Sequence, residues 1–519
     1  MSQDRPNILC IVTDQMRADH MSCAGHPVVR TPNLDRLAAS GVRFARAYVN
    51  NPLCMPSRAT MFTGMTPRGH KVRTNGVELD ERRAVMPETL RRAGWRTHAV
   101  GKLHLKTMGL PRGVDPESVD PAAWPESSAL WRKGLIRRLP LPYYGLETVD
   151  FAPGHGPGIS GDYLNWLREI HGDAEKLMRP ENAREKPSGV EGCWKMALPA
   201  ELHHSRWVAD RTIDFLKTAR QEAQPFFCWT SFPDPHHPYC PPYPYCDAYA
   251  PADIPLPARR KGELDDLAPF FREVFEKGIQ LSGRSAGRPT NLADHEIREI
   301  LALTFGMISQ IDDNVGRILD ALDELGLRED TLVVFLADHA DMMGDHWLLN
   351  KGPFHFEGLL RVPFIWSWPG HIAQGQTTDA LASVLDFVPT LHKLTGIPID
   401  EARRTEVVET SAELPPVPGR SLAGLLDGSC DAVQDSVIVE NDEDYLGTQL
   451  RTLVTADAKL TLYTGKPWGE LFDLTRDPNE LRNLWDDPGA SRLKTEMTER
   501  LLYRLAETDS VLPRRQSHA

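Results

Sequence analysis

The chain has 519 residues, of which 41% are hydrophobic and 25% charged. These ordinary globular values exclude a fibrous, disordered or low-complexity protein, and the length allows several domains or one large α/β domain with a smaller partner. The 59 basic and 72 acidic residues give a net charge of -13, which argues against sequence-independent binding of nucleic acid.

Membrane and targeting segments are not evident in the sequence. No run approaches the roughly 18 to 20 apolar residues of a membrane span, and the start, MSQDRPNILC, lacks the apolar core of a signal peptide. The eight cysteines match no paired zinc-binding spacing; Cys240 and Cys246 could hold a metal or a disulfide, but we expect reduced loop residues. We therefore expect a cytoplasmic protein that binds neither nucleic acid nor membrane.

The first elements along the chain predict a strand, a helix and a strand. Residues 7–13, NILCIVT, form a continuous apolar run, which is typical of a strand buried on both faces. In TPNLDRLAASG, Thr31 can cap a helix, Pro32 can occupy its first turn and Gly41 can end it. Residues 42–49, VRFARAYV, alternate like a strand.

The alternation of strands and helices continues to about residue 400. Further strands are predicted at residues 95–102, 225–232, 331–338 and 362–369, and a long amphipathic helix at about 294–325. This order predicts an α/β fold with a mostly parallel sheet covered by helices on both faces.

We expect two units in the chain. A catalytic α/β domain would occupy residues 1–400, with an insertion at about 105–200 that is rich in Pro, Gly and Trp. A composition break at residues 399–421 would then lead to a small α+β unit at 421–519.

Polar side chains follow the predicted strands at the edge where an open α/β sheet binds its ligands. They are Asp14 and Gln15, Lys102 and His104, His236 and His237, and Asp338 and His339, with Lys351 shortly after. Each residue type is more often structural when it stands alone, so the shared placement is what indicates a site. Carboxylates with an amide and an imidazole suit Ca²⁺, Mn²⁺ or Mg²⁺, and the lysines and histidines suit a tetrahedral phosphate or sulfate ester.

Cys54 stands in NPLCMPSRATMFTG, where a helix is predicted to begin. Backbone N–H groups at a helix start, together with Arg58, would stabilise an anion and lower the pKa of the thiol. A small buried cysteine at a strand-to-helix turn is the structural alternative.

The segment CMPSR, residues 54–58, resembles the sulfatase signature CxPSR, in which the cysteine is converted after translation to formylglycine. NILCIVTDQ resembles the first metal-binding strand of that family, GKLH its GKxH segment, and PHHP its PHxP segment. LADHADMMGDHWLLNKG resembles SDHGxxxGDHxLxxKG, and ELFDLTRDPNELRNL resembles the C-terminal ELYDLxxDPxExxNL. The chain therefore resembles the type I, formylglycine-dependent sulfatases of the alkaline phosphatase superfamily along nearly its whole length.

The resemblance implies a role for each matching residue. The metal ligands would be Asp14, Gln15, modified Cys54, Asp338 and His339. Ca²⁺ is the expected ion, with Mn²⁺ or Mg²⁺ as the alternatives. Arg58 would orient the formylglycine, and the sulfate oxygens and leaving group would be handled by Lys102, His104, His236 and Lys351, with Asn75 as a further polar contact. His237, His346 and His355 are expected to be structural or peripheral.

The resemblance also implies a mechanism and partners. A hydroxyl of the hydrated aldehyde would attack sulfur, the alcohol would leave with help from His236 or Lys351, and His104 would assist release of sulfate. The expected partners are a small-molecule sulfate ester, aryl or small alkyl, and a formylglycine-generating maturation enzyme. A homo-oligomer, dimer or tetramer, is also expected.

The pair Asp14-Gln15 departs from the sulfatase pattern, in which two adjacent aspartates are common. An Asp-Gln pair resembles the related phosphonate monoester hydrolases, which use the same formylglycine on phosphonate esters and phosphodiesters. Lys102 and His104, however, match the sulfatases, whereas that branch has a neutral segment with Tyr and Thr. We therefore favour sulfate esters, keep the phosphonate hydrolase as the alternative, and keep an unmodified, catalytically silent metal-binding protein as the second.

Overall fold

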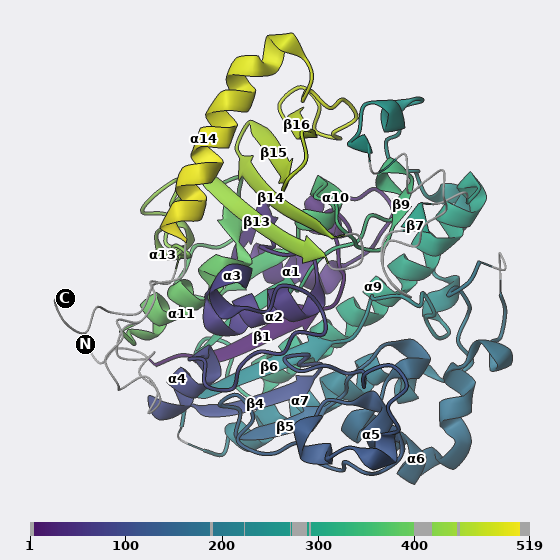
Figure 1. Cartoon of the computed structure of the whole chain (residues 1–519). Helices are drawn as coiled ribbons and strands as arrows, with labels where there is room; N and C mark the ends of the chain where they lie inside the picture. The colour runs from purple at the N-terminus through teal and green to yellow at the C-terminus, as the bar shows by residue number, and fades with distance from the viewer. Residues whose placement is uncertain are drawn as a thin grey trace.

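The structure of the chain is a computed structural model that describes residues 5–186, 190–222, 224–269, 271, 288–289, 292–398, 418–443 and 447–508. Within these residues the strands form an eight-stranded sheet, a four-stranded sheet and two short two-stranded sheets (Figure 1). The strands are β1 Asn7–Thr13, β2 Val42–Phe44, β3 Ala47–Tyr48, β4 Arg96–Gly101, β5 Thr148–Phe151, β6 Phe226–Phe232, β7 Arg288–Pro289, β8 Thr331–Ala337, β9 Leu348–Leu349, β10 Phe364–Ser367, β11 Gln376–Thr378, β12 Ala382–Ser383, β13 Ser436–Glu443, β14 Thr448–Thr455, β15 Ala458–Tyr463 and β16 Gly469–Asp473.

The large sheet has the order β11-β2-β10-β8-β1-β6-β4-β5. Its central strands β8, β1, β6 and β4 run parallel, while β10 is antiparallel to both of its neighbours. The residues of β6 and β8 are all buried, as expected for apolar strands covered on both faces. The predicted mostly parallel α/β fold is therefore confirmed.

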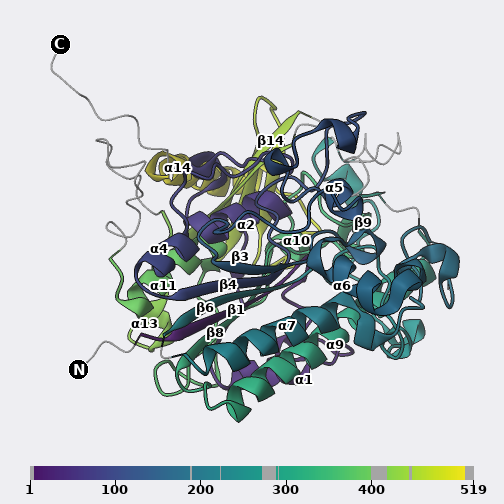
Figure 2. The same ribbon diagram turned by 90° about the horizontal axis from the view of Figure 1, so that it is seen from below.

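Helices cover both faces of the large sheet (Figure 2). One layer contains α1, α7 and α9, and the other contains α2, α4 and α11. The helices are α1 Pro32–Ala39, α2 Cys54–Thr63, α3 Pro67–His70, α4 Met86–Arg92, α5 Ser128–Arg132, α6 Gly161–His171, α7 His204–Ala219, α9 Asp294–Glu324, α10 Glu357–Leu360, α11 Phe387–Thr395, α13 Ala423–Leu426 and α14 Ser491–Glu507. None of the helices in the described ranges is long and apolar enough to cross a bilayer.

Two local predictions differ from the structure. The strand expected at residues 42–49 is divided, because β2 joins the large sheet beside β10 while β3 pairs with β12 in a separate sheet. Thr31 precedes α1 as predicted, but its side chain does not cap the helix; its hydroxyl accepts the backbone N–H of Ser22 at 2.9 Å. Alternation alone could not reveal the turn between β2 and β3, since both halves are extended.

The C-terminal part forms the antiparallel sheet β13-β14-β15-β16, against which α14 packs (Figure 1). Backbone and side-chain hydrogen bonds of Asn50 with Ile438 and Glu440, both 2.8 Å, join this sheet to the segment before α2. The expected break at residues 399–421 lies mostly outside the described residues, so the boundary between the two units stays a prediction. The expected insertion at 105–200 contributes β5, which extends the large sheet beside β4.

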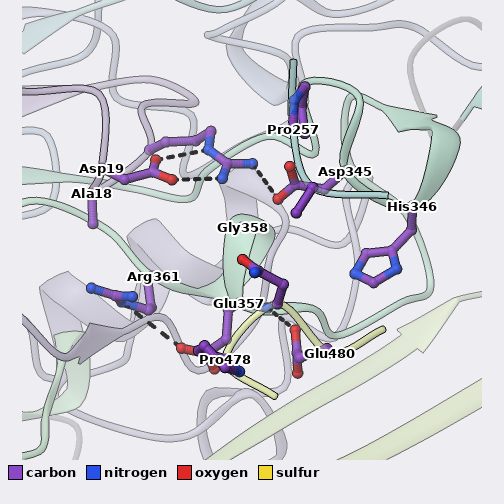
Figure 3. A pocket seen from close by; sticks show the side chains of 13 residues that line it. Ala18, Asp19, Pro257, Asp345, His346, Glu357, Gly358, Arg361, Pro478 and Glu480 are labelled. Carbon is purple, nitrogen blue, oxygen red and sulfur yellow. Dashed lines mark hydrogen bonds and ion pairs between the residues drawn. The ribbon is translucent and has the colours of Figure 1, made fainter. Parts of the chain in front are cut away.

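A polar cavity of about 210 Å³ lies between the two sheets' connecting loops (Figure 3). Arg17 forms ion pairs there with Asp19 at 2.7 Å and Asp345 at 2.8 Å, and Glu480 accepts the backbone N–H of Glu357 at 2.7 Å. The Arg17 ion pair with Asp345 connects the loops that follow β1 and β8, and the Glu480 contact connects the C-terminal unit to the start of α10. The residues predicted to carry out catalysis lie elsewhere.

Candidate active site

Four neighbouring parallel strands of the large sheet bring the predicted site residues to one edge. Asp14 follows β1, Lys102 follows β4, His236 follows β6 and Asp338 follows β8. Backbone hydrogen bonds continue the sheet beyond the strand ends: the N–H of Asp14 donates to Asp234 O at 3.0 Å, and that of Asp338 donates to Thr13 O at 3.1 Å. The sheet therefore fixes the relative positions of these side chains.

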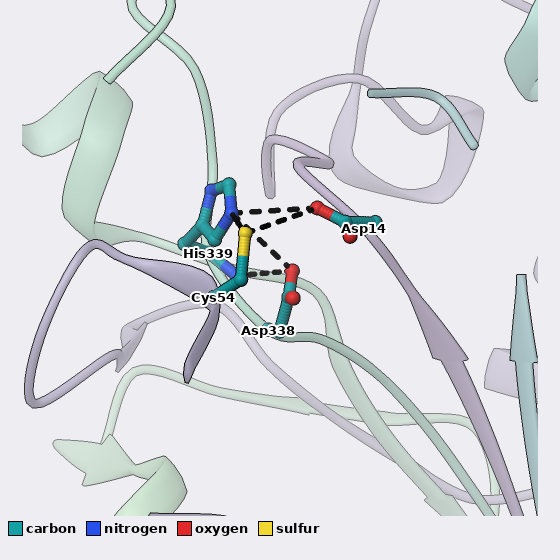
Figure 4. Close-up of side chains that lie close together, drawn as sticks. All are labelled: Asp14, Cys54, Asp338 and His339. Atoms are coloured by element: carbon teal, nitrogen blue, oxygen red, sulfur yellow. Dashed lines mark hydrogen bonds and ion pairs between the residues drawn. The ribbon is translucent and has the colours of Figure 1, made fainter. Parts of the chain in front are cut away.

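Two carboxylates, an imidazole and a thiol converge at this edge (Figure 4). One ligand atom each from Asp14, Cys54, Asp338 and His339 lies within 4.8 Å of the others, and all four residues are buried. His339 Nδ1 donates to Ala340 O at 2.9 Å, so its Nε2 faces Asp14 Oδ1 at 3.4 Å and Cys54 Sγ at 3.1 Å. The donor set and its burial fit a divalent cation.

Gln15 adds an oriented oxygen atom to the cluster. Its backbone N–H donates to Asp338 Oδ1 at 3.2 Å, and its side-chain Oε1 accepts from Lys351 Nζ at 3.3 Å. The side-chain amide nitrogen donates to Asp341, a buried residue that sequence reasoning missed although it stands in the DHADMMGDH motif. The backbone of Gln15 has φ 67°, which is uncommon for a residue with a side chain and typical of strained functional positions.

Cys54 is the first residue of α2, as predicted, and every residue of this helix is buried. Arg58, one turn later, donates to Asp338 Oδ2 at 2.7 Å, to Lys102 O at 2.8 Å and to Ser231 Oγ at 3.0 Å. Arg58 therefore ties α2 to the ends of β8, β4 and β6. Asn75 Oδ1 accepts the backbone N–H of Met55 at 3.0 Å and so holds the first turn of α2.

Two lysines supply positive charge around Cys54. Lys351 Nζ lies 3.1 Å from Cys54 Sγ and 3.0 Å from the Nε2 atoms of both His236 and His339, while Lys102 Nζ contacts the Asp14 carboxylate. Burial and Asp14 oppose ionisation of the thiol, but Lys102, Lys351 and His339 lower the pKa of Cys54 to about 7. The environment thus stabilises an anion at the position of Cys54.

The two predicted catalytic histidines are buried and neutral. His236 Nδ1 donates to the carbonyl of His237 at 2.5 Å, which leaves the Nε2 lone pair facing Lys351. Burial and then His155 lower the pKa of His236 well below its usual value. Burial, Lys102 and Arg58 do the same to His104, whose Nδ1 has no hydrogen-bond partner among the described residues.

His155 belongs to the site although no sequence pattern indicated it. Its ring stacks on that of His236 with centroids 3.5 Å apart and planes at 10°, and its Nε2 lies 3.1 Å from Lys102 Nζ. Its Nδ1 faces Pro233 O at 3.3 Å and must donate there, so Nε2 accepts from Lys102. The local sequence GHGPG indicates no more than a turn, and both glycines that flank His155 have positive φ in the structure.

The histidines expected to be peripheral fall into two groups. His237 contacts the site, because its ring stacks on His236 at 4.0 Å and its Nδ1 lies 3.0 Å from Gln15 Nε2. His346 stacks on Phe356, and His355 Nδ1 lies 2.7 Å from Thr452 Oγ1. His346 and His355 therefore lie at the junction, by which we mean the contact between the segment after β8 and the C-terminal sheet.

Comparison with known proteins places this geometry in a family. The sulfatase family profile matches residues 6–397, and the profile of the C-terminal region of N-sulphoglucosamine sulphohydrolase matches residues 344–507. The chain belongs to the sulfatase family. It is thus a sulfuric ester hydrolase of the alkaline phosphatase superfamily, as its sequence motifs predicted.

Three similar proteins differ in the activity for which they are named. An arylsulfatase of Clostridium perfringens is 29% identical over 92% of this chain and 90% of its own length. The multifunctional alkaline phosphatase superfamily protein PehA of Trinickia caryophylli is 28% identical, with coverage of 98% and 97%. The crystal structure of the phosphonate monoester hydrolase of Agrobacterium radiobacter is also 28% identical and superimposes with a TM-score of 0.79, with coverage of 97% and 96%.

Proposed function

We propose that this sulfatase hydrolyses sulfate monoesters of an aryl or small alkyl alcohol, with formylglycine derived from Cys54 as the nucleophile. The observation that carries the proposal is the surroundings of the Cys54 sulfur, which lies 3.1 Å from both Lys351 Nζ and His339 Nε2 at the edge of the parallel sheet. The fixed positive charge there would stabilise an electron-rich nucleophile, and a site that cleaves a sulfate ester requires such charge.

We propose Asp14, Gln15, Asp338 and His339, with the modified Cys54, as the ligands of one divalent cation. The two carboxylates and the oriented Gln15 oxygen support Ca²⁺, and the imidazole nitrogen keeps Mn²⁺ and Mg²⁺ as alternatives. When bound, such an ion supplies Lewis acidity beside the nucleophile.

The side chains around this centre would have different roles in the reaction. Lys102 and Lys351 would bind the non-bridging sulfate oxygens through their ammonium groups, and the raised pKa of Lys351, which Cys54 and Asp14 produce against the effect of burial, keeps it charged. Lys351 donates to His236 Nε2 at 3.0 Å, so this pair holds a proton that can move to the departing alkoxide. His104, buried and neutral, would accept the proton when sulfate is released.

Maturation would precede folding. All residues of the CMPSR segment, 54–58, are buried in the folded chain, and Cys54 is 2% exposed, so a formylglycine-generating enzyme could not reach them there. We therefore propose that this enzyme acts on the unfolded or nascent chain. A homo-oligomer and a cytoplasmic location stay predictions.

Two observations favour a phosphonate or phosphodiester substrate as the second candidate. Gln15 replaces the second aspartate of common sulfatases, and the phosphonate monoester hydrolase superimposes over nearly the whole chain. Lys102 and His104 support the sulfate ester, since the phosphonate branch has neutral residues there. The ester classes share charge and geometry, so we expect side activity on phosphonates.

The test compares the hydrolysis of an aryl sulfate and an aryl phosphonate monoester that share one leaving group. The protein is coexpressed with a formylglycine-generating enzyme, and conversion of Cys54 is measured by peptide mass spectrometry. A higher kcat/KM for the sulfate supports the proposal, and a higher kcat/KM for the phosphonate overturns the choice of substrate. No hydrolysis of either ester by fully converted, metal-replete protein would overturn the assignment of activity, whereas an unconverted Cys54 in native cells would favour the silent protein.

A further inference from the structure

A second group of metal-ligating side chains lies beside the active site, outside the residues assigned above. His203 and His204 stand at the start of α7, and Asp234 stands in the loop after β6. Their side chains are buried, at 2%, 0% and 1% exposure, and one ligand atom from each lies within 4.8 Å of the others. Asp234 also accepts the backbone N–H of Asp14 through its carbonyl at 3.0 Å, so the two clusters are adjacent.

The separations within this cluster do not fit hydrogen bonds. His203 Nδ1 lies 3.8 Å from Asp234 Oδ2, and His204 Nε2 lies 3.7 Å from Asp234 Oδ1. A contact beyond about 3.5 Å is not a direct hydrogen bond, and a bridging water with two bonds of about 2.8 Å separates its partners by about 4.5 Å. Two metal–ligand bonds of about 2.1 Å that meet at about 109 to 120° hold their ligand atoms about 3.4 to 3.6 Å apart.

Hydrogen bonds of Ser205 fix which atoms carry lone pairs. The Ser205 hydroxyl donates its one proton to Asp234 Oδ2 at 2.7 Å, so it can only accept from His204 Nδ1, at 3.5 Å. His204 Nε2 is then unprotonated, and it has no hydrogen-bond partner among the described residues. His203 Nδ1 also carries no proton, because the Ser205 backbone N–H donates to it over a long 3.3 Å contact, which binding of a cation would replace.

The unpartnered Nε2 lone pair of His204 and the weakly bonded Nδ1 of His203 thus lie beside one buried carboxylate. Such an arrangement is repulsive unless a cation lies between the three groups. A proton on the carboxylate could not bridge a gap of 3.7 Å to His204.

We propose that His203, His204 and Asp234 bind a transition-metal cation of the Zn²⁺ class. Two imidazole nitrogens and a carboxylate oxygen are a typical zinc donor set, whereas Ca²⁺ and Mg²⁺ prefer oxygen ligands. Water would complete the coordination. Because the ligands are buried, the ion binds as the chain folds and joins α7 to the loop that carries His236 two residues after Asp234.

The test is metal analysis of the full-length protein by mass spectrometry after growth with added Zn²⁺ and removal of loosely bound ions. A Cys54→Ala background removes the thiolate of the first site. We expect about one equivalent of zinc, which is lost in His204→Gln and retained in Asp338→Asn and in the exposed control His171→Gln. The absence of zinc from the parent protein, or its retention in His204→Gln, overturns the proposal.

A second measurement covers the case in which His204→Gln does not fold. The parent protein is refolded with Co²⁺, which reports tetrahedral or five-coordinate binding by its visible d–d absorption, and Zn²⁺ is then added. The proposal expects one equivalent of absorbing cobalt that Zn²⁺ displaces, and no such band overturns it. Neither readout depends on sulfate hydrolysis, so the proposed zinc site and the proposed hydrolysis are tested independently of each other.

Discussion

The active site and the junction with the C-terminal unit both bury clusters of charge, but the balance of charge differs. Around Cys54, the carboxylates of Asp14 and Asp338 contact Lys102, Arg58 and, through Cys54, Lys351. At the junction, Lys459 pairs with Glu480 and Glu357 and interacts with Glu470, and the partly exposed Arg361 also pairs with Glu357.

The pKa values reflect this difference. Lys102 holds the pKa of Asp14 well below its usual value in spite of burial. Burial raises the pKa of Glu470 to about 8 and that of Glu480 to about 7, because Lys459 only partly offsets it. An excess of cations prepares the first cluster for an anionic substrate, whereas the second retains protons and serves stability.

Loss of the nucleophile should have the largest effect on the first cluster. Cys54→Ala removes the only atom there that can become formylglycine, and we expect the hydrolysis rate of an aryl sulfate to fall at least about 10⁴-fold. Cys430→Ala, at a partly exposed cysteine that follows α13, should keep its activity. Retention of a few per cent of the rate by Cys54→Ala would place the nucleophile elsewhere.

Removal of one cation tests whether the charge excess drives catalysis. Lys351→Ala deletes the ammonium that contacts both Cys54 and His236, and we expect kcat to fall about 10²- to 10³-fold, as for loss of one oxyanion donor. Lys466→Ala, on an exposed loop, should behave as the parent protein. A rise in KM with unchanged kcat would show instead that Lys351 only binds the ground state.

The junction should respond to pH in the opposite sense from an ordinary surface carboxylate. The pKa of Glu470 is about 8 in the folded chain and near 4.5 when unfolded, so its stabilising contribution is full below 4.5 and is lost as the pH rises through 8. We expect Glu470→Gln to reduce the fall in unfolding free energy between pH 6 and 9 by about 2 kcal/mol, since one pKa unit is worth about 1.4 kcal/mol.

Urea unfolding of both proteins at the two pH values measures this difference. Glu480, whose pKa is also raised, remains in the variant and gives a pH dependence of the same sign. The fall in unfolding free energy should therefore become smaller without vanishing. Glu496→Gln, on the exposed face of α14, is the matched control. Parallel pH profiles of the unfolding free energy for Glu470→Gln and the parent would contradict the raised pKa of Glu470.

The sequence predicted the sheet edge better than the loops that surround it. Asp14 and Asp338 directly follow apolar runs, so a local pattern placed them at parallel strand ends, and the sheet then brought them together. His155 lies in a segment of weak periodicity, and its stacking on His236 depends on how a loop of the insertion returns over the sheet. The contact between Ser205 and Asp234 likewise joins two segments whose pairing no local pattern encodes.

His155 provides the finest test of the charge arrangement, because it acts through another residue. Its Nε2 accepts from Lys102 and its ring supports His236, so His155→Ala should lower kcat/KM about tenfold, or about 1.4 kcal/mol, while the exposed His171→Ala should not. His155→Gln can still accept a hydrogen bond from Lys102 and should recover part of the loss. If His155→Gln and His155→Ala were equally impaired, stacking on His236 rather than orientation of Lys102 would be the contribution of this loop to the cationic site.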